Sequence, residues 1–102
     1  MKEITTKQLA EKQKEDADIS IIDVREDEEV ANGMIPGARH IPLGEIPHRL
    51  SEIDKDKTHY LVCRSGGRSG KASEFMDEHG YDVINVDGGM LEWKEDTVKK
   101  DQ

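Results

Sequence analysis

The apolar residues of this chain gather in short runs, and this arrangement limits the folds that the chain can adopt. The two clearest runs are ISII at residues 19–22 and YLVC at residues 60–63, each bounded by charged or turn-forming residues. Such runs are typical of strands that are buried on both faces. Segments with helical spacing of apolar residues lie between the runs, most clearly at residues 70–79. Strands that alternate with helices predict an α/β domain with four or five mostly parallel strands and helices on both faces.

The same pattern predicts where the elements lie. Strands are expected near Ile4 and at residues 19–24, 38–43, 58–62 and 81–86, and helices at residues 5–15, 27–31, from Pro47 onward, at 70–79 and after Gly88. The length of 102 residues suits a single domain over 1–102, with its core at about 4–93. Residues 94–102 are strongly charged, so we expect a frayed tail there.

Charge and cysteine content exclude several classes of protein. Acidic residues number 23 and basic residues 15, which gives a net charge of −8. Nucleic acids and anionic membranes are bound through clustered Lys and Arg, so neither is an expected partner. The single cysteine allows no internal disulfide and fits a reducing compartment. Because no long apolar stretch and no apolar leader segment are present, we expect a cytoplasmic protein, and we expect a monomer.

Residues 63–69, CRSGGRS, are the segment most suited to chemistry. They follow a predicted strand and open a predicted helix, and reactive sites of parallel sheets lie beyond the carboxyl ends of strands. A helix N-terminus and cationic neighbours lower the pKa of a cysteine thiol. The two glycines allow positive φ, so that successive backbone N–H groups can turn toward one point. We therefore expect an anion cradle around a partly exposed Cys63 thiolate, with Arg64 and Arg68 beside it.

A buried, inert core cysteine is the alternative interpretation of Cys63, but two glycines and two arginines in the next five residues do not suit a core. No histidine is placed to act as its base. His59 lies four residues upstream on the same predicted strand, about 13 Å away, which is beyond hydrogen-bond reach. We interpret the four histidines as structural. None has metal-ligand spacing with Cys63, so we expect no metal and no cofactor.

Three segments together resemble the motifs of the single-domain rhodaneses, a family of sulfurtransferases. Residues 21–25 (IIDVR) look like the family's Asp-Val-Arg strand end, residues 33–42 (GMIPGARHIP) like its Gly-His-Ile-Pro-Gly-Ala motif, and residues 63–68 (CRSGGR) like its six-residue active loop. Gly88 and Gly89 with Trp93 are similar to the family's closing segment, so the resemblance covers roughly residues 4–93. It departs at Met34, where the family has His. That motif mostly shapes a turn, so we expect little effect on the chemistry.

The resemblance implies a mechanism in which the Cys63 thiolate attacks the outer sulfur of a donor such as thiosulfate and becomes a persulfide. A thiol acceptor, or cyanide in an assay, would then remove that sulfur. The residues implied to hold the anionic donor and the persulfide are Arg64, Ser65, Gly66, Gly67 and Arg68. Asp23 and Arg25 are expected to support the site through an ion pair or hydrogen bonds to loop backbone, and residues 26–29 to form a solvated acidic face. Arg68 has a structural alternative, in which it ties the loop to a carboxylate such as Asp23.

Two other functions remain open at this point. A related loop of phosphatases and arsenate reductases has five residues between its cysteine and its arginine, whereas only four separate Cys63 from Arg68. This smaller ring of amides suits a sulfur atom better than a tetrahedral phosphate. The second alternative is a sulfur-relay carrier or partner-binding domain, which would accept sulfur from a partner protein without turnover of its own. The presence of Cys63 argues against an inert domain but does not separate a carrier from an enzyme.

Overall fold

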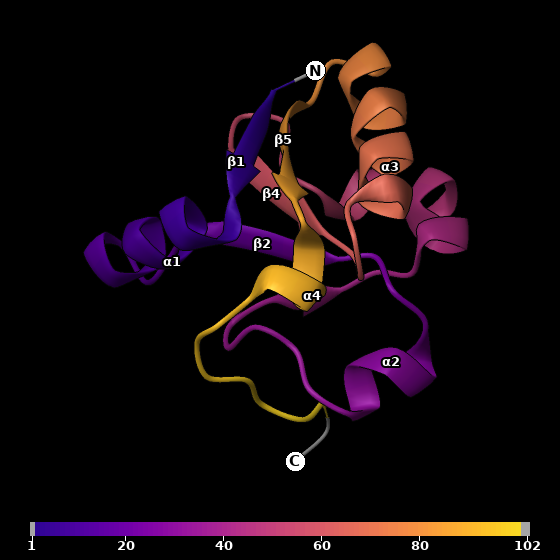
Figure 1. Ribbon diagram of the computed structural model, residues 1–102. Helices are drawn as coiled ribbons and strands as arrows, with labels where there is room; N and C mark the ends of the chain where they lie inside the picture. The colour runs from indigo at the N-terminus through magenta and orange to yellow at the C-terminus, as the bar shows by residue number, and fades with distance from the viewer. Residues whose placement is uncertain (1, 101–102) are drawn as a thin grey trace.

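The computed structural model describes residues 2–100 and is built on a five-stranded sheet (Figure 1). The strands are β1 (Glu3–Thr5), β2 (Ser20–Asp23), β3 (Arg39–His40), β4 (Thr58–Val62) and β5 (Asp82–Asp87). Their order across the sheet is β1-β5-β4-β2-β3, and every neighbouring pair is parallel. The predicted α/β class and the mostly parallel sheet of four or five strands are therefore confirmed.

Helices cover both faces of this sheet, because alternate strand residues are apolar toward each face. Tyr60 and Val62 of β4 belong to the core shared with α1 (Thr6–Glu15), whereas Leu61 belongs to the core shared with α3 (Gly67–Glu78). Figure 1 shows α1 and α3 on opposite sides of the strands. Two shorter helices, α2 (Asp27–Ala31) and α4 (Gly89–Glu92), lie at the carboxyl end of the sheet. No helix within residues 2–100 combines the length and the apolarity that crossing a membrane requires.

Three elements differ from the sequence-based expectation. The helix expected from Pro47 onward is a pair of short 3-10 helices, Leu43–His48 and Leu50–Glu52, with Pro47 inside the first. Proline lacks the N–H that a longer α-helix needs at this point. β3 is only two residues long, and α3 begins three residues earlier than expected because the left-handed backbone of Gly66, with φ 110°, leads directly into it.

The charged C-terminal segment is also different, because residues 94–100 lie against the domain instead of fraying. Met34 and Val98 form an antiparallel bridge through backbone hydrogen bonds of 2.7 and 2.9 Å. The Lys100 ammonium donates to Nδ1 of His40 over 2.8 Å. The side chain of Met34, where the sequence departs from the motif that it resembles, is buried. The composition of the tail predicted fraying, whereas backbone pairing holds it; residues 101–102 lie outside the described range.

Candidate active site

Cys63 directly follows β4 at the carboxyl end of the sheet, where the strand pattern predicts a reactive group. Its side chain belongs to the apolar core beneath α3, and the residue is only 1% exposed. The expectation of a partly exposed thiol is therefore wrong. The cause is the tight loop of residues 64–66, which folds back over the sulfur before α3 begins.

Two donors contact the Cys63 sulfur. The Gly66 backbone N–H donates to Sγ over 3.1 Å, and the Ser69 hydroxyl donates over 3.3 Å. Ser69 is completely buried, and its hydroxyl also donates to Asn85 Oδ1, so Sγ and Oδ1 share its single proton. The Asn85 amide donates to the Gly66 carbonyl over 3.2 Å. The loop, the first turn of α3 and strand β5 thus enclose the sulfur together.

Sequence analysis missed Ser69 and Asn85 as members of this site. Ser69 lies one residue beyond the loop that the motif defines, in the first turn of α3, where a side chain can point back to the end of the strand. Asn85 is a polar residue in the apolar strand β5, and buried polar side chains require partners. A polar residue inside an apolar strand was therefore a signal from which the sequence could have predicted a buried hydrogen bond at Asn85. Its partner, however, follows only from the pairing of β4 with β5, which sets Leu61 opposite Asn85.

The surroundings of Cys63 lower the pKa of its thiol. Burial raises the pKa of the thiol, because charge is less stable away from water. The Ser69 hydroxyl and the nearby backbone N–H groups of Ser69, Gly66 and Ser65 together lower the pKa by more. The result is a pKa for Cys63 below its ordinary value. The lowering comes from directed hydrogen-bond donors, and no histidine is among its causes.

The start of α4 is joined to the loop by two backbone hydrogen bonds. The N–H of Met90 donates to the carbonyl of Cys63 over 2.8 Å, and that of Leu91 donates to the carbonyl of Arg64 over 3.0 Å. These hydrogen bonds require the backbone at Gly89, whose φ is +56°, to lie very close to the backbone of the loop. A Cβ atom at Gly89 would lie 2.4 Å from the carbonyl oxygen of Cys63 and 2.6 Å from that of Arg64. Only glycine fits between the two segments without moving the backbone of the site.

Asp23 and Arg25 form the expected ion pair, and both residues are buried. The guanidinium grips the carboxylate through Nε and Nη2 at 2.9–3.1 Å. Nη2 also donates to the carbonyl of Gly33 over 2.7 Å. These contacts tie the end of β2 to the turn after α2, and they do not include backbone of the loop at residues 64–66. The pair therefore fixes the carboxyl end of β2, next to the end of β4 that leads into Cys63.

Arg68 is engaged by an acidic partner that the sequence analysis did not identify. Its two terminal nitrogens meet the two carboxylate oxygens of Glu29, each over 2.7 Å. Asp23, the carboxylate considered as a structural partner of Arg68, is paired with Arg25 instead. The expectation that residues 26–29 form a solvated face is consequently wrong for Glu29 and holds for the exposed residues 26–28. Along the loop, Arg64, Ser65 and Gly67 are exposed.

The histidines that form hydrogen bonds do so away from the sulfur. His59 lies between the Ser20 hydroxyl and the Asp54 carbonyl, at 2.6 Å from each. His40 contacts the carbonyl of Arg25 through Nε2 over 2.7 Å. Within the part of the chain that the structure describes, no three His, Cys, Asp or Glu side chains gather as metal ligands.

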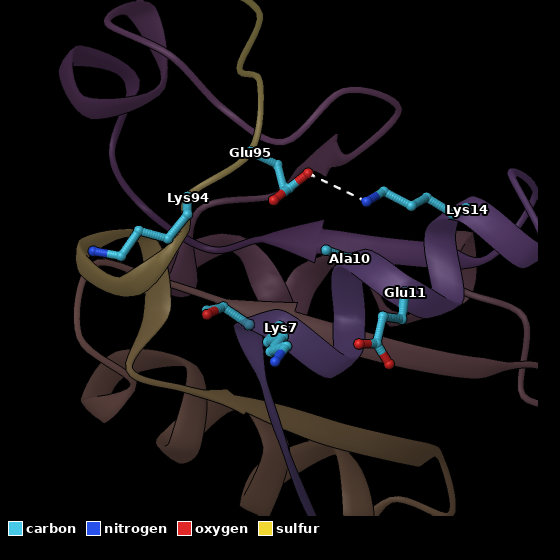
Figure 2. A pocket seen from close by; sticks show the side chains of 7 residues that line it. Lys7, Ala10, Glu11, Lys14, Lys94 and Glu95 are labelled. Carbon is cyan, nitrogen blue, oxygen red and sulfur yellow. Dashed lines mark ion pairs between the residues drawn. The ribbon is translucent and has the colours of Figure 1, made fainter.

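A separate hollow of about 300 Å³ lies between α1 and the segment after α4 (Figure 2). Lys7, Lys14 and Lys94 line it together with glutamates, and Lys14 pairs with Glu95 over 3.6 Å. No residue of the Cys63 loop contributes to its wall. The candidate chemistry is therefore located at the sheet end and not in this hollow.

Comparison with known proteins agrees with this architecture. The family described as "Rhodanese-like domain" matches residues 5–96. A Bacillus subtilis protein named "Putative sulfurtransferase YtwF" is 49% identical over 100 residues, which cover 98% of this chain and 97% of the relative. The "Thiosulfate sulfurtransferase PspE" of Escherichia coli is 37% identical over 71 residues, 68% of each chain. The crystal structure of a rhodanese-like domain protein from Staphylococcus aureus has a TM-score of 0.92 at 43% identity and covers 98% of this chain and 99% of its own. The chain therefore belongs to the rhodanese-like domain family.

Proposed function

We propose that this protein is a sulfurtransferase that carries sulfane sulfur on Cys63, from thiosulfate or a persulfide donor to a thiol or to cyanide. The observation that carries the proposal is the environment of the sulfur, where the N–H of Gly66 and the hydroxyl of Ser69 both lie within hydrogen-bond distance of Sγ. Donors arranged in this way stabilise a thiolate, and the thiolate is the nucleophilic form of cysteine. Family membership and the names of the relatives support the same reaction class.

With thiosulfate as donor, the Cys63 thiolate forms a bond to the outer sulfur, and the bond between the two donor sulfurs breaks. Its electron pair leaves with sulfite, and Cys63 keeps the outer sulfur as a persulfide anion. An acceptor thiolate or cyanide then attacks that outer sulfur and restores the Cys63 thiolate. Neither step changes the total charge or needs a further oxidant or reductant. In this proposal residues 64–67 bind the donor, with their backbone N–H groups facing the transferred sulfur. Arg68, which the sequence also placed among the donor-binding residues, is held by Glu29 instead.

The loop size supports sulfur transfer over phosphate hydrolysis. Four residues separate Cys63 from Arg68, one fewer than in the related phosphatase loop. In addition, Arg68 already holds a carboxylate. Both features leave less room and less positive charge for a bound phosphate. We expect no appreciable hydrolysis of an aryl phosphate by the purified protein.

The test is turnover with thiosulfate and cyanide, followed as formation of thiocyanate. We expect repeated turnover by the unmodified protein and none by Cys63→Ser, because a serine hydroxyl is not ionised near neutral pH and cannot form a persulfide. Transfer retained in Cys63→Ser would place the chemistry at another residue. Formation of the Cys63 persulfide without turnover would identify a sulfur-relay carrier instead of a free-standing enzyme.

A further inference from the structure

The contact between Arg68 and Glu29 joins the loop of the candidate active site to α2. Both hydrogen bonds of the pair measure 2.7 Å, and the two side chains are 35% and 28% exposed. Oε1 of Glu29 also accepts the backbone N–H of Glu26 over 3.0 Å, which fixes the carboxylate at the start of α2. A two-pronged contact of this kind sets the orientation of the guanidinium as well as its charge balance. Arg68 is therefore held toward α2 by a carboxylate that is itself held in place.

Both partners are charged across the working range of pH. The hydrogen bond from Arg68 holds the pKa of Glu29 at about 2, and that bond likewise raises the pKa of Arg68. The negative charges of Cys63 and Glu26 raise the pKa of Arg68 further, so the guanidinium lies close enough to sense the thiolate. An anion that approaches Cys63 thus meets an arginine whose charge is already balanced.

The charged residues around the pair do not make up for the positive charge of Arg68 that Glu29 neutralises. Glu26, Asp27 and Glu28 are exposed along α2, and the whole chain carries a net charge of −8. Arg64 is the exposed cation of the loop. A donor with two negative charges therefore meets more repulsion at this site than a donor with one, and the difference grows with each uncompensated acidic group nearby.

We infer that Glu29 is a positioning residue that keeps Arg68 from binding the donor, and so makes the site select sulfur donors of low charge over dianions such as thiosulfate. This inference rests on the proposed function. Glu29 lies outside the loop motif, and it sets the donor selectivity through its contact with Arg68. Persulfides presented by a larger molecule carry at most one charge at the reacting group and fit this preference.

Two small sulfur donors differ mainly in their net negative charge. Thiosulfate is a dianion, and the methanethiosulfonate anion replaces one of its oxygens by a methyl group and carries a single charge. In both reactions the Cys63 thiolate bonds to the outer sulfur and the S–S bond breaks. Sulfite leaves in the first case and methanesulfinate in the second. The same persulfide forms on Cys63, so the ratio of the two values of kcat/KM reports how the site treats the extra charge.

The experiment measures this ratio, thiosulfate over methanethiosulfonate, in the wild-type protein and three variants. Glu29→Gln removes the carboxylate charge and frees the charge of Arg68, so we expect the ratio to rise about tenfold, the Coulomb effect of one unit charge at about 12 Å near a protein surface. Glu28→Gln is the matched control, because it removes the same charge from an exposed neighbour on α2. We expect its ratio within about twofold of wild type. Glu29→Asp keeps the charge and should keep the low ratio.

A ratio that stays unchanged or falls in Glu29→Gln, with both donors active, overturns this inference alone. A protein that takes sulfur from neither donor overturns the proposed function as well. The wild-type protein gives a second test that depends on no variant. Its thiosulfate kcat/KM should stay constant or rise as KCl increases from about 20 to 300 mM, because salt screens the repulsion. A fall of more than about threefold would show a site that attracts dianions, and would overturn the inference.

Discussion

Ser69 is the side chain that most directly stabilises the Cys63 thiolate, and its removal should raise the pKa of the thiol. The hydroxyl lies 3.3 Å from Sγ and is completely buried, so its proton is shared between Sγ and Asn85 Oδ1 and not with water. A hydrogen bond to a charged group contributes about 1.5–3 kcal/mol. Sulfur is a weak acceptor, so the lower end applies. About 1.5 kcal/mol corresponds to about one pKa unit for Ser69→Ala.

The pKa is measured from the ultraviolet absorbance of the thiolate as pH rises. The wild-type midpoint should lie below about 8.5, the reference value for a free cysteine, and that of Ser69→Ala about one unit above wild type. The rate of persulfide formation should fall in the variant below its midpoint. At higher pH, where both thiols are ionised, the two rates should converge. That convergence separates a pKa effect from general damage to the site.

Ser73→Ala provides a matched control on the same helix. Ser73 lies one turn further along α3 and is completely buried, and its hydroxyl has no hydrogen-bond partner within residues 2–100. Its removal should leave the Cys63 midpoint unchanged. Equal midpoints for wild type and Ser69→Ala would refute the assignment of Ser69, and the backbone N–H groups would then carry the stabilisation alone.

Three further predictions concern the scaffold. In thermal unfolding, Gly89→Ala should cost about 2–5 kcal/mol against about 1–2 kcal/mol for Gly37→Ala. Both positions have positive φ, but only at Gly89 does the new Cβ meet backbone, at 2.4 Å, so equal costs would contradict the close approach. Asp23→Asn should lower the free energy of unfolding in urea by about 3–5 kcal/mol, because it leaves the Arg25 guanidinium buried without its charge partner; a loss below about 1 kcal/mol would count against this. Because Glu29 has a pKa of about 2 against its usual 4.5, its contribution to stability is complete above pH 4.5 and is lost as pH falls toward 2. Wild type and Glu29→Gln should therefore converge in stability over that range, and a constant gap would argue against the pair.

The position of the candidate site follows from local patterns in the sequence. Apolar runs placed the strands, and the rule that parallel sheets react at their carboxyl ends directed attention to the loop after β4. The glycines and the spacing from Cys63 to Arg68 then indicated an anion cradle. Each of these features depends on neighbours within a few residues, so a single sequence contains enough information to predict it.

The partners of the site residues were beyond such reasoning, because they come from distant parts of the chain. Arg68 meets Glu29 across 39 residues, and the contact depends on where α2 sits against α3. Burial of Cys63 depends on how tightly residues 64–66 fold over it. The tail was predicted to fray from its composition, but its pairing with Met34 is made by backbone atoms, which composition does not describe.

The most direct test of a sulfur-carrying Cys63 is the mass of the intact protein after incubation with a sulfane-sulfur donor. Incubation with methanethiosulfonate or thiosulfate, followed by removal of the small molecules, should leave a gain of one sulfur atom. Peptide analysis should place that atom on Cys63, and brief treatment with cyanide should remove it. Cys63→Ser should gain nothing under the same conditions. An unmodified mass after both donors, or a gain of sulfur that persists in Cys63→Ser, would contradict the account.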